Sequence, residues 1–506
     1  MAKDLKKQRS IKKNIIANYI GQGYQALIGI VMMPIYLSYL GSEAFGLIGF
    51  YIMLQSWMQL LDLGMKPTLA RESAKYRAGS VSIFELREVL RTLEVIFIST
   101  GLVMAIAIMF SSHYIATNWL KVETLNLQTV ASAVSFMGLV VGTRWVSSLY
   151  SGVVSGLEKQ VWLNGFNVVA STFRFVGIVG VFYLFEPSII LFFIYQGIIS
   201  ILELLVIQYY TYYNFEKVYD KVSYSFEVLK KIYKFSLAIA FGSITWVIVT
   251  QIDKLVLSKY IPLKEYGYFS LAIVIANGLF VLGNAIGSAI MPRMTVYSEQ
   301  KNFEALEKLY FLSMEIVLLI VVPVSALLVF NGEELLYLWT HDLVAAKKAS
   351  EIMKWYVLGN AMVSMGAFAY YLQYARGDLK LHVKGNIIYA SVLIPLQVYM
   401  ASNFGPIYTG IVWFIVNLLI VVVWLGVIHK KFLKGKHLLW LYRNAKMFIG
   451  GYFVVYIMTY YLNVNLEYNL MAFLKLILIG TISLVVTFLF STNLKTKFYK
   501  GVKYGS

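Results

Sequence analysis

No charged residue interrupts the chain over residues 385–428. A transmembrane helix needs about 20 predominantly apolar residues to cross a hydrocarbon core of roughly 30 Å, so this run is long enough for two of them. Residues 403–406 read Asn-Phe-Gly-Pro, a combination typical of a turn. The run therefore predicts two membrane-spanning helices joined by a short turn.

The same pattern recurs along the whole chain, in which 59% of the residues are hydrophobic and 14% are charged. A soluble domain has about 25% charged residues and could not bury this much apolar surface. We therefore predict an all-α integral membrane protein with about 14 transmembrane helices. The expected spans are 15–37, 44–63, 90–110, 128–150, 162–184, 189–210, 235–252, 269–290, 311–330, 355–375, 385–402, 407–428, 446–462 and 470–490.

The distribution of positive charge predicts how the chain is oriented. The formal charge is +18, from 44 Lys and Arg against 26 Asp and Glu, and the basic residues lie mainly in alternate loops. Basic loops favour the cytoplasmic side, so both termini are expected there, although Lys254, Lys259 and Lys264 would then lie outside. We find no nucleic-acid-binding motif and expect no nucleic-acid partner. The basic segment before the first span is followed by no small-residue cleavage site, so that span is expected to be retained.

A weak internal repeat suggests how the spans are grouped. Residues 39–46 resemble residues 260–267, and Leu69-Ala70-Arg71 falls opposite Met291-Pro292-Arg293. Both copies cover the first outer loop and the second helix of a six-helix set, and six helices return the chain to the same side. We therefore predict two parallel six-helix lobes around a central cavity, related by an axis along the membrane normal. The expected divisions are 1–215 and 216–430 for the lobes and 431–506 for two added helices and a cytoplasmic tail.

Polar side chains recur at helical spacing within several spans. A polar group facing lipid has no partner, so such faces should point inward. Helix-to-helix hydrogen bonding in a packed bundle would also explain them. Taken together, they favour a hydrated cavity that binds substrate. The candidate binding residues are Asn18, Gln22, Gln25, Gln55, Gln59, Asn164, Asn167, Asn277 and Asn284.

Two arginines within spans, Arg144 and Arg174, are the most specific candidates. A guanidinium in a membrane is costly and does not lose its proton, and Arg174 lies too deep to reach the interface easily. Its planar fork suits the oxygens of a phosphate or diphosphate. The alternative is a structural ion pair, for which Glu203 on the next span is the expected partner of Arg174.

Carboxylates within or near spans could bind a coupling H⁺ or Na⁺, because burial raises the pKa of a carboxyl group towards neutral pH. The candidates are Asp62, Glu203 and Asp253.

Motifs typical of enzymes are scarce. The absence of cysteine excludes disulfides, thiolate catalysis and Cys-based metal sites. The longest expected outer loop, 331–354, holds His341 and Asp342 without a nucleophile or a further metal ligand at a telling spacing. We therefore expect a transporter rather than an enzyme, with neither cofactor nor metal.

Several short motifs, in a consistent order, carry a resemblance to a known family. They are Leu40-Gly41-Ser42-Glu43-Ala44-Phe45-Gly46-Leu47, Leu61-Asp62-Leu63-Gly64, Ser155-Gly156-Leu157-Glu158-Lys159, Thr172-Phe173-Arg174, Gln251-Ile252-Asp253-Lys254, Tyr266-Gly267-Tyr268 and Ile290-Met291-Pro292-Arg293. Over roughly residues 14–428 the chain resembles the O-antigen and capsule-type flippases of the multidrug/oligosaccharidyl-lipid/polysaccharide exporter superfamily. The resemblance implies two six-helix lobes around a cationic cavity. It also implies outward movement of an undecaprenyl-diphosphate-linked oligosaccharide by alternating access.

The resulting hypothesis is a multi-pass flippase of the bacterial cytoplasmic membrane that serves polysaccharide or lipopolysaccharide biosynthesis. Arg144 and Arg174 would hold the diphosphate, and the Asn and Gln faces would bind the sugar. Its partners would be the lipid-linked oligosaccharide, membrane lipids, a coupling ion and other glycan-assembly proteins. The alternatives are a cation-coupled multidrug antiporter of the same superfamily and a membrane enzyme of glycan assembly.

Overall fold

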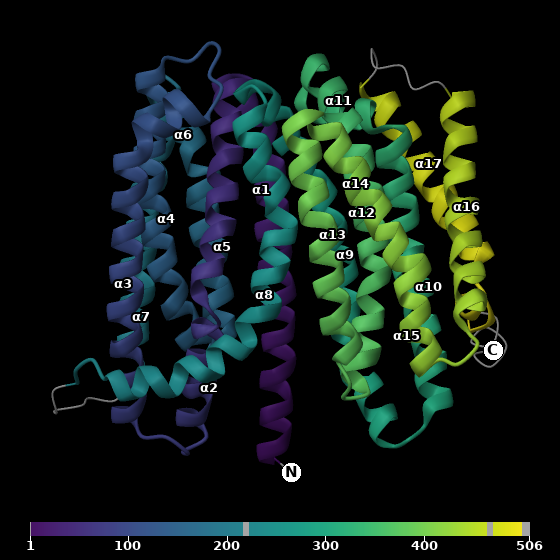
Figure 1. Cartoon of the computed structure of the whole chain (residues 1–506), viewed down its shortest axis with the longest axis horizontal. Helices are drawn as coiled ribbons and strands as arrows, with labels where there is room; N and C mark the ends of the chain where they lie inside the picture. Colours follow the sequence, from purple (N-terminus) through teal and green to yellow (C-terminus); the bar gives the residue numbers. More distant parts are fainter. Residues whose placement is uncertain (1, 216–221, 463–468, 498–506) are drawn as a thin grey trace. The chain divides into compact units, whose positions relative to one another are not determined.

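A computed structural model of the chain describes residues 2–215, 222–462 and 469–497. The chain divides into two compact units, Met1–Gly267 and Tyr268–Ser506. The elements of both units are helices, as drawn in Figure 1, so the expected all-α class is confirmed.

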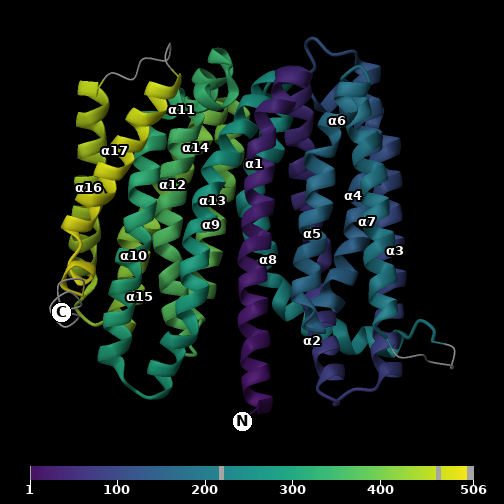
Figure 2. The same cartoon turned by 180° about the vertical axis from the view of Figure 1, so that it is seen from behind.

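The first unit contains the helices that carry the two candidate arginines and their partners. Figures 1 and 2 show α3, α4, α5 and α7 running side by side. The elements are α1 (Ala2–Met58), η1 (Gln59–Asp62), α2 (Met65–Arg77), α3 (Ile83–Tyr114), η2 (Ile115–Trp119), α4 (Leu127–Gly156), α5 (Gln160–Phe175), α6 (Gly177–Leu184), α7 (Ile189–Tyr213) and α8 (Phe226–Tyr260).

Helix α1 contains the first expected span and most of the second, which continues into η1, and a kink at Gly41 separates the two. This residue has φ 80° and ψ 167°, a backbone conformation that a side chain would strain. The outer turn expected between these spans is therefore a single sharp kink.

The two copies of the internal repeat contact each other within the first unit through reciprocal glycines. A Cβ on Gly46 would collide with the carbonyl oxygen of Leu263, and a Cβ on Gly267 would collide with that of Ser42. Gly46 aligns with Gly267 in the repeat, and Ser42 aligns with Leu263. The two contacts are thus equivalent, and each depends on a glycine that has no side chain.

Helix α9 (Leu263–Glu299) begins in the first unit and leads into the second. The remaining elements are α10 (Phe303–Phe330), α11 (Gly332–Thr340), α12 (Leu343–Ala375), α13 (Lys380–Asn403), α14 (Pro406–Leu419), η3 (Ile420–Trp424), α15 (Leu425–Phe432), α16 (His437–Leu462) and α17 (Asn469–Phe490). The expected turn at 403–406 is confirmed, with Gly405 at φ 91°. The long loop expected over 331–354 is wrong, because α11 and the start of α12 occupy it.

The two C-terminal helices pack against α10 inside the second unit. The hydroxyl of Tyr452 donates to Ser325 at 2.9 Å. The carboxylate of Glu315, which is 1% exposed, accepts the backbone N–H groups of residues 492–494 at 2.7–3.2 Å. A buried carboxylate is stable where several donors satisfy it, so Glu315 fastens the segment after α17 to α10.

All fourteen expected spans lie in helices. In the described part of the chain, ten helices are long and apolar enough to cross a membrane, and one of them, 17–62, contains two expected spans. The other three expected spans lie in α8, α9 and α12.

Candidate functional site

A break in the fifth expected span positions Arg174. Helix α5 ends at Phe175 and α6 begins at Gly177, so Arg174 occupies the last turn of α5 rather than the middle of a continuous helix. Such a break leaves backbone carbonyl groups without helical partners. Side chains from neighbouring helices satisfy them.

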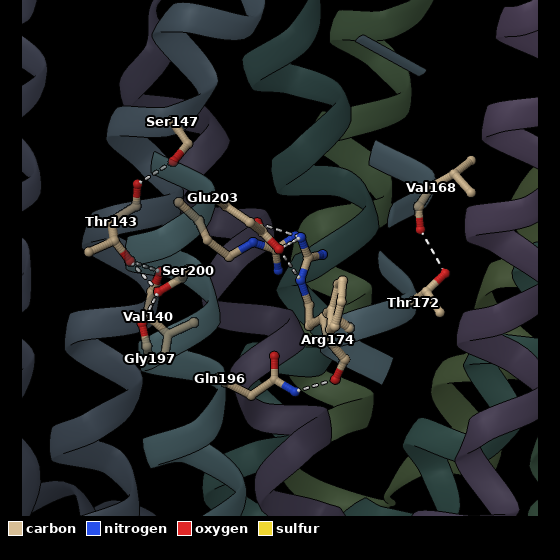
Figure 3. Close-up of polar contacts among 12 residues, drawn as sticks. Val140, Thr143, Ser147, Val168, Thr172, Arg174, Gln196, Gly197, Ser200 and Glu203 are labelled. Carbon is tan, nitrogen blue, oxygen red and sulfur yellow. Dashed lines mark hydrogen bonds and ion pairs between the residues drawn. The ribbon is translucent and has the colours of Figure 1, made fainter. Parts of the chain in front are cut away.

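Three successive carbonyl oxygens at this break accept hydrogen bonds from α7 and α1. The donors are Tyr195 to Phe173 at 2.6 Å, Gln196 to Arg174 at 3.1 Å and Tyr36 to Phe175 at 2.7 Å. Figure 3 shows the bond from Gln196. The backbone that carries the Arg174 side chain is therefore fixed on two sides.

The side chain of Arg174 forms a bidentate ion pair with Glu203 of α7 (Figure 3). Its Nη2 donates to Oε1 at 2.5 Å and to Oε2 at 2.6 Å, and its Nε donates to Oε1 at 3.1 Å. The two side chains are 13% and 11% exposed. The structure thus contains the ion pair that the sequence suggested as the alternative to ligand binding.

Arg144, on α4, has a different environment. Its Nη1 donates to the hydroxyl of Tyr51 at 3.3 Å and to Oε1 of Gln55 at 3.0 Å. Both acceptors are neutral, and among the described residues no carboxylate forms a salt bridge with Arg144. Glu203 nevertheless lies close enough to Arg144 to attract it, and Arg174 lies close enough to repel it.

These five residues, Arg144, Arg174, Glu203, Tyr51 and Gln55, form what we call the arginine cluster. It lies inside the first unit and combines side chains from α1, α4, α5 and α7. Two guanidinium groups face one carboxylate, so the cluster has one uncompensated positive charge. A guanidinium keeps its proton, and this surplus therefore favours an anionic ligand.

Packing of α7 against α4 and α1 holds the cluster together. The hydroxyls of Thr143 and Ser200 lie 2.7 Å apart, immediately beside Arg144 and one turn before Glu203 (Figure 3). The rings of Tyr51 and Phe193 meet edge to face at 5.4 Å. These contacts limit the movement of the side chains of Arg144 and Glu203.

The other polar candidates of the first unit have mixed surroundings. Asn164 donates to Asn18 at 2.5 Å, which links α5 to α1. Gln25 donates to the carbonyl of Gly21 in its own helix at 3.1 Å. The remaining candidates Gln22 and Gln59 are exposed and Asn167 is half-buried. Only Gln55 joins the arginine cluster, while Asn18 and Asn164 use their amides for helix contact.

Among the described residues of the second unit, one amide that the sequence pattern did not single out makes three side-chain hydrogen bonds. Asn360 of α12 is 1% exposed, donates to the carbonyl of Ala276 at 2.8 Å and accepts from Trp413 at 2.8 Å. It also donates to the candidate Asn277, which is itself exposed, at 3.4 Å. The side chain of the last candidate, Asn284, lies outside the described residues.

The candidate ion-coupling carboxylates do not gather at one place. Asp62 accepts the backbone N–H of Lys66 at 2.9 Å near the start of α2. Asp253 of α8 pairs with its neighbour Lys254 at 3.1 Å. Glu203 is therefore the candidate that meets the arginines. In the described part of the chain, no three His, Asp or Glu side chains approach one another as metal ligands would.

Tyr51 is a member of the cluster that the sequence analysis did not name. It precedes Gln55 by four residues and Gln59 by eight, so it shares their helix face. Tyrosine is amphipathic and was not counted as polar, although this spacing could have identified it.

Comparison with known proteins places the chain in a family. The family model "Polysaccharide biosynthesis protein" matches residues 11–298, and the model "MatE" matches residues 238–399. The chain is 21% identical over 410 residues to the protein named "Putative O-antigen transporter" of Shigella flexneri, covering 80% of this chain and 94% of that one.

Solved structures show the same fold at low sequence identity. "Lipid II flippase MurJ, inward closed conformation" is similar with a TM-score of 0.69 and 14% identity, over 93% of this chain and 98% of that chain. An inward-facing multidrug resistance MATE family transporter of the MOP superfamily is similar with a TM-score of 0.65 and 14% identity, over 80% and 94%. The predicted all-helical membrane architecture is therefore confirmed, as is the prediction of a transporter rather than an enzyme. The chain belongs to the polysaccharide biosynthesis protein family and has the fold of MOP-superfamily transporters.

Proposed function

We propose that this transporter flips an undecaprenyl-diphosphate-linked oligosaccharide from the inner to the outer leaflet of a bacterial cytoplasmic membrane. The lipid-linked oligosaccharide would serve the export of a surface polysaccharide such as O-antigen, and transport would proceed by alternating access. The observation that carries the proposal is the arginine cluster, which holds surplus positive charge in the transmembrane part of the first unit. Family membership supports polysaccharide biosynthesis as its setting.

The chemistry of the cluster suits a diphosphate. Arg144 has donors left over after its bonds to Tyr51 and Gln55, and a guanidinium can bind two phosphate oxygens at once. Arg174 would be a second ligand once it separates from Glu203. The proposed sugar-binding residues are Asn18, Gln22, Gln25, Gln55, Gln59, Asn164, Asn167, Asn277 and Asn284, while the lipid tail would stay in the bilayer.

Variants of Arg174 separate ligand binding from a purely structural role. Membrane abundance and surface-glycan production are measured in cells lacking the native gene. If Arg174 binds the diphosphate, Arg174→Lys retains part of the activity because a point cation still attracts the anion, whereas Arg174→Gln abolishes it. The double variant Arg174→Gln with Glu203→Gln then accumulates in the membrane but stays inactive. Recovery of glycan production in the double variant would mean that the pair is only structural.

A cation-coupled multidrug antiporter is a second candidate, favoured by the MatE match over residues 238–399. An antiporter should lower the drug accumulation of cells and should depend on a coupling carboxylate. The candidate carboxylates Asp62 and Asp253 interact with lysines of their own surroundings, whereas Glu203 pairs with an arginine. Drug accumulation that is unchanged by the protein, together with lost surface glycan in its absence, would favour the flippase.

A further inference from the structure

The carboxylate of Glu203 binds the guanidinium group of Arg174 in the way that a diphosphate would bind it. Its two oxygens take the Nη2 and Nε donors of the guanidinium, which are the donors that a bidentate phosphate would use. Arg144 lacks such a partner among the described residues and bonds only to neutral groups. One arginine is thus available to an anion, and the other is covered by an internal anion.

We propose that Glu203 is a displaceable counter-ion, and that an anionic diphosphate ester binds first at Arg144 and then replaces Glu203 on Arg174. This inference rests on the proposed function and adds a role for Glu203. The displaced carboxylate takes up a proton, so that binding of the headgroup and protonation of Glu203 occur together.

The charge balance of the cluster supplies the reason for proton uptake. A diphosphate diester carries two negative charges, which two guanidinium groups neutralise. If Glu203 stayed ionised, the occupied cluster would hold an unpaired negative charge with low exposure, which is costly. Protonation of Glu203 removes that charge, whereas in the empty cluster the carboxylate is paired with the guanidinium of Arg174.

Among the neighbouring titratable groups, Glu203 is the one that can take up this proton. The titratable and charged side chains that interact electrostatically with the two arginines are Glu203 from α7, Tyr51 and Tyr36 from α1, and the arginines themselves. Tyr195 of α7 is also near, next to Tyr36. Guanidinium groups and neutral tyrosines do not gain a proton near neutral pH.

The test measures how binding of a defined probe depends on pH. The probe is farnesyl-diphosphoryl-N-acetylglucosamine, a diphosphate diester whose own charge is constant between pH 6 and 8. Its affinity for the purified full-length protein in detergent is measured by intrinsic tryptophan fluorescence. If one proton is taken up on binding, the affinity of the wild type falls about tenfold for each pH unit over the range in which the free carboxylate is ionised and the bound carboxyl is protonated.

Substitutions at Glu203 should remove this dependence. Glu203→Gln binds the probe with an affinity that is independent of pH and higher than that of the wild type at pH 7.5. The double variant Arg174→Gln with Glu203→Gln, which removes the repulsion between the two guanidinium groups if the single variant is unstable, binds more weakly and also independently of pH. The exposed Glu186→Gln, a matched loss of one carboxylate in an outer loop, keeps the wild-type slope.

Different results would overturn the proposed function and the counter-ion role of Glu203. A probe that binds no better than farnesyl-N-acetylglucosamine, which lacks the diphosphate, would overturn the proposed function and this inference with it. Binding that requires the diphosphate but has the same pH slope in wild type and Glu203→Gln would overturn the counter-ion role alone. A wild-type affinity that does not depend on pH would likewise overturn only the counter-ion role.

Discussion

Neutralising either member of the Arg174–Glu203 pair should destabilise the protein, and the structure predicts that the two changes differ in size. Glu203→Gln leaves two guanidinium groups, which repel each other, with no carboxylate. Removing one partner of a buried pair costs about 3–5 kcal/mol, and the low exposure of this pair places it near that range. Arg174→Gln should cost less, about 1–3 kcal/mol for lost charged hydrogen bonds, because Arg144 still attracts Glu203.

The assay is thermal unfolding of the purified variants, followed by tryptophan fluorescence. We expect the double variant, Arg174→Gln with Glu203→Gln, to have the highest unfolding temperature of the three. The single variant Arg174→Gln should follow, and Glu203→Gln should unfold at the lowest temperature. Glu304→Gln is the control, because it removes an ion pair to Lys308 whose side chains are 74% and 79% exposed and should change little. A Glu203→Gln protein at least as stable as Arg174→Gln would refute the idea that the two arginines share one carboxylate.

Three further predictions concern other parts of the chain. Since the chain has no native cysteine, a single cysteine at Lys434 should resist an impermeant reagent in intact cells and one at Glu186 should react; labelling at Lys434 would reverse the topology. In Gly177→Ala the new Cβ would collide with the hydroxyl of Tyr195 and displace it, so transport should fall more than membrane abundance. Unchanged transport would show that the break in the fifth span needs no fixed geometry. Glu315→Gln should loosen the segment after α17 and speed its hydrogen exchange, whereas unchanged exchange there would show that the carboxylate does not hold it.

The sequence predicted the membrane helices well, because an apolar run of spanning length has few alternatives in lipid. The turn at Gly405 was similarly clear, since glycine and proline restrict the backbone in recognisable ways. Helix α11, which lies where a loop was expected after Asn331, was missed because it is short and lies outside any expected span. Length and hydropathy do not reveal such elements.

The candidate site was predicted in part. Arg144, Arg174 and Glu203 could be named because a charge within a span is costly and needs a partner. The pairing of Glu203 with Arg174 could also be suggested from the sequence. The neutral partners of Arg144 and the break after Phe175 could not, because no periodic pattern encodes them. The role of the amides in sugar binding stays a prediction: Asn18 and Asn164 lie on the expected inward faces, and in the structure they bond to each other.

Flipping by the purified protein in liposomes tests whether the arginine cluster holds a diphosphate headgroup during transport. Proteoliposomes are loaded with a fluorescent undecaprenyl-diphosphate-linked N-acetylglucosamine, and the fraction of headgroups accessible to an external quencher is followed over time. We predict that wild-type protein exposes the inner-leaflet pool, while Arg144→Gln, reconstituted in equal amount, leaves most of it protected. Equal flipping by the wild type and Arg144→Gln, or none by a folded wild type, would contradict the claim that this arginine holds the diphosphate during transport.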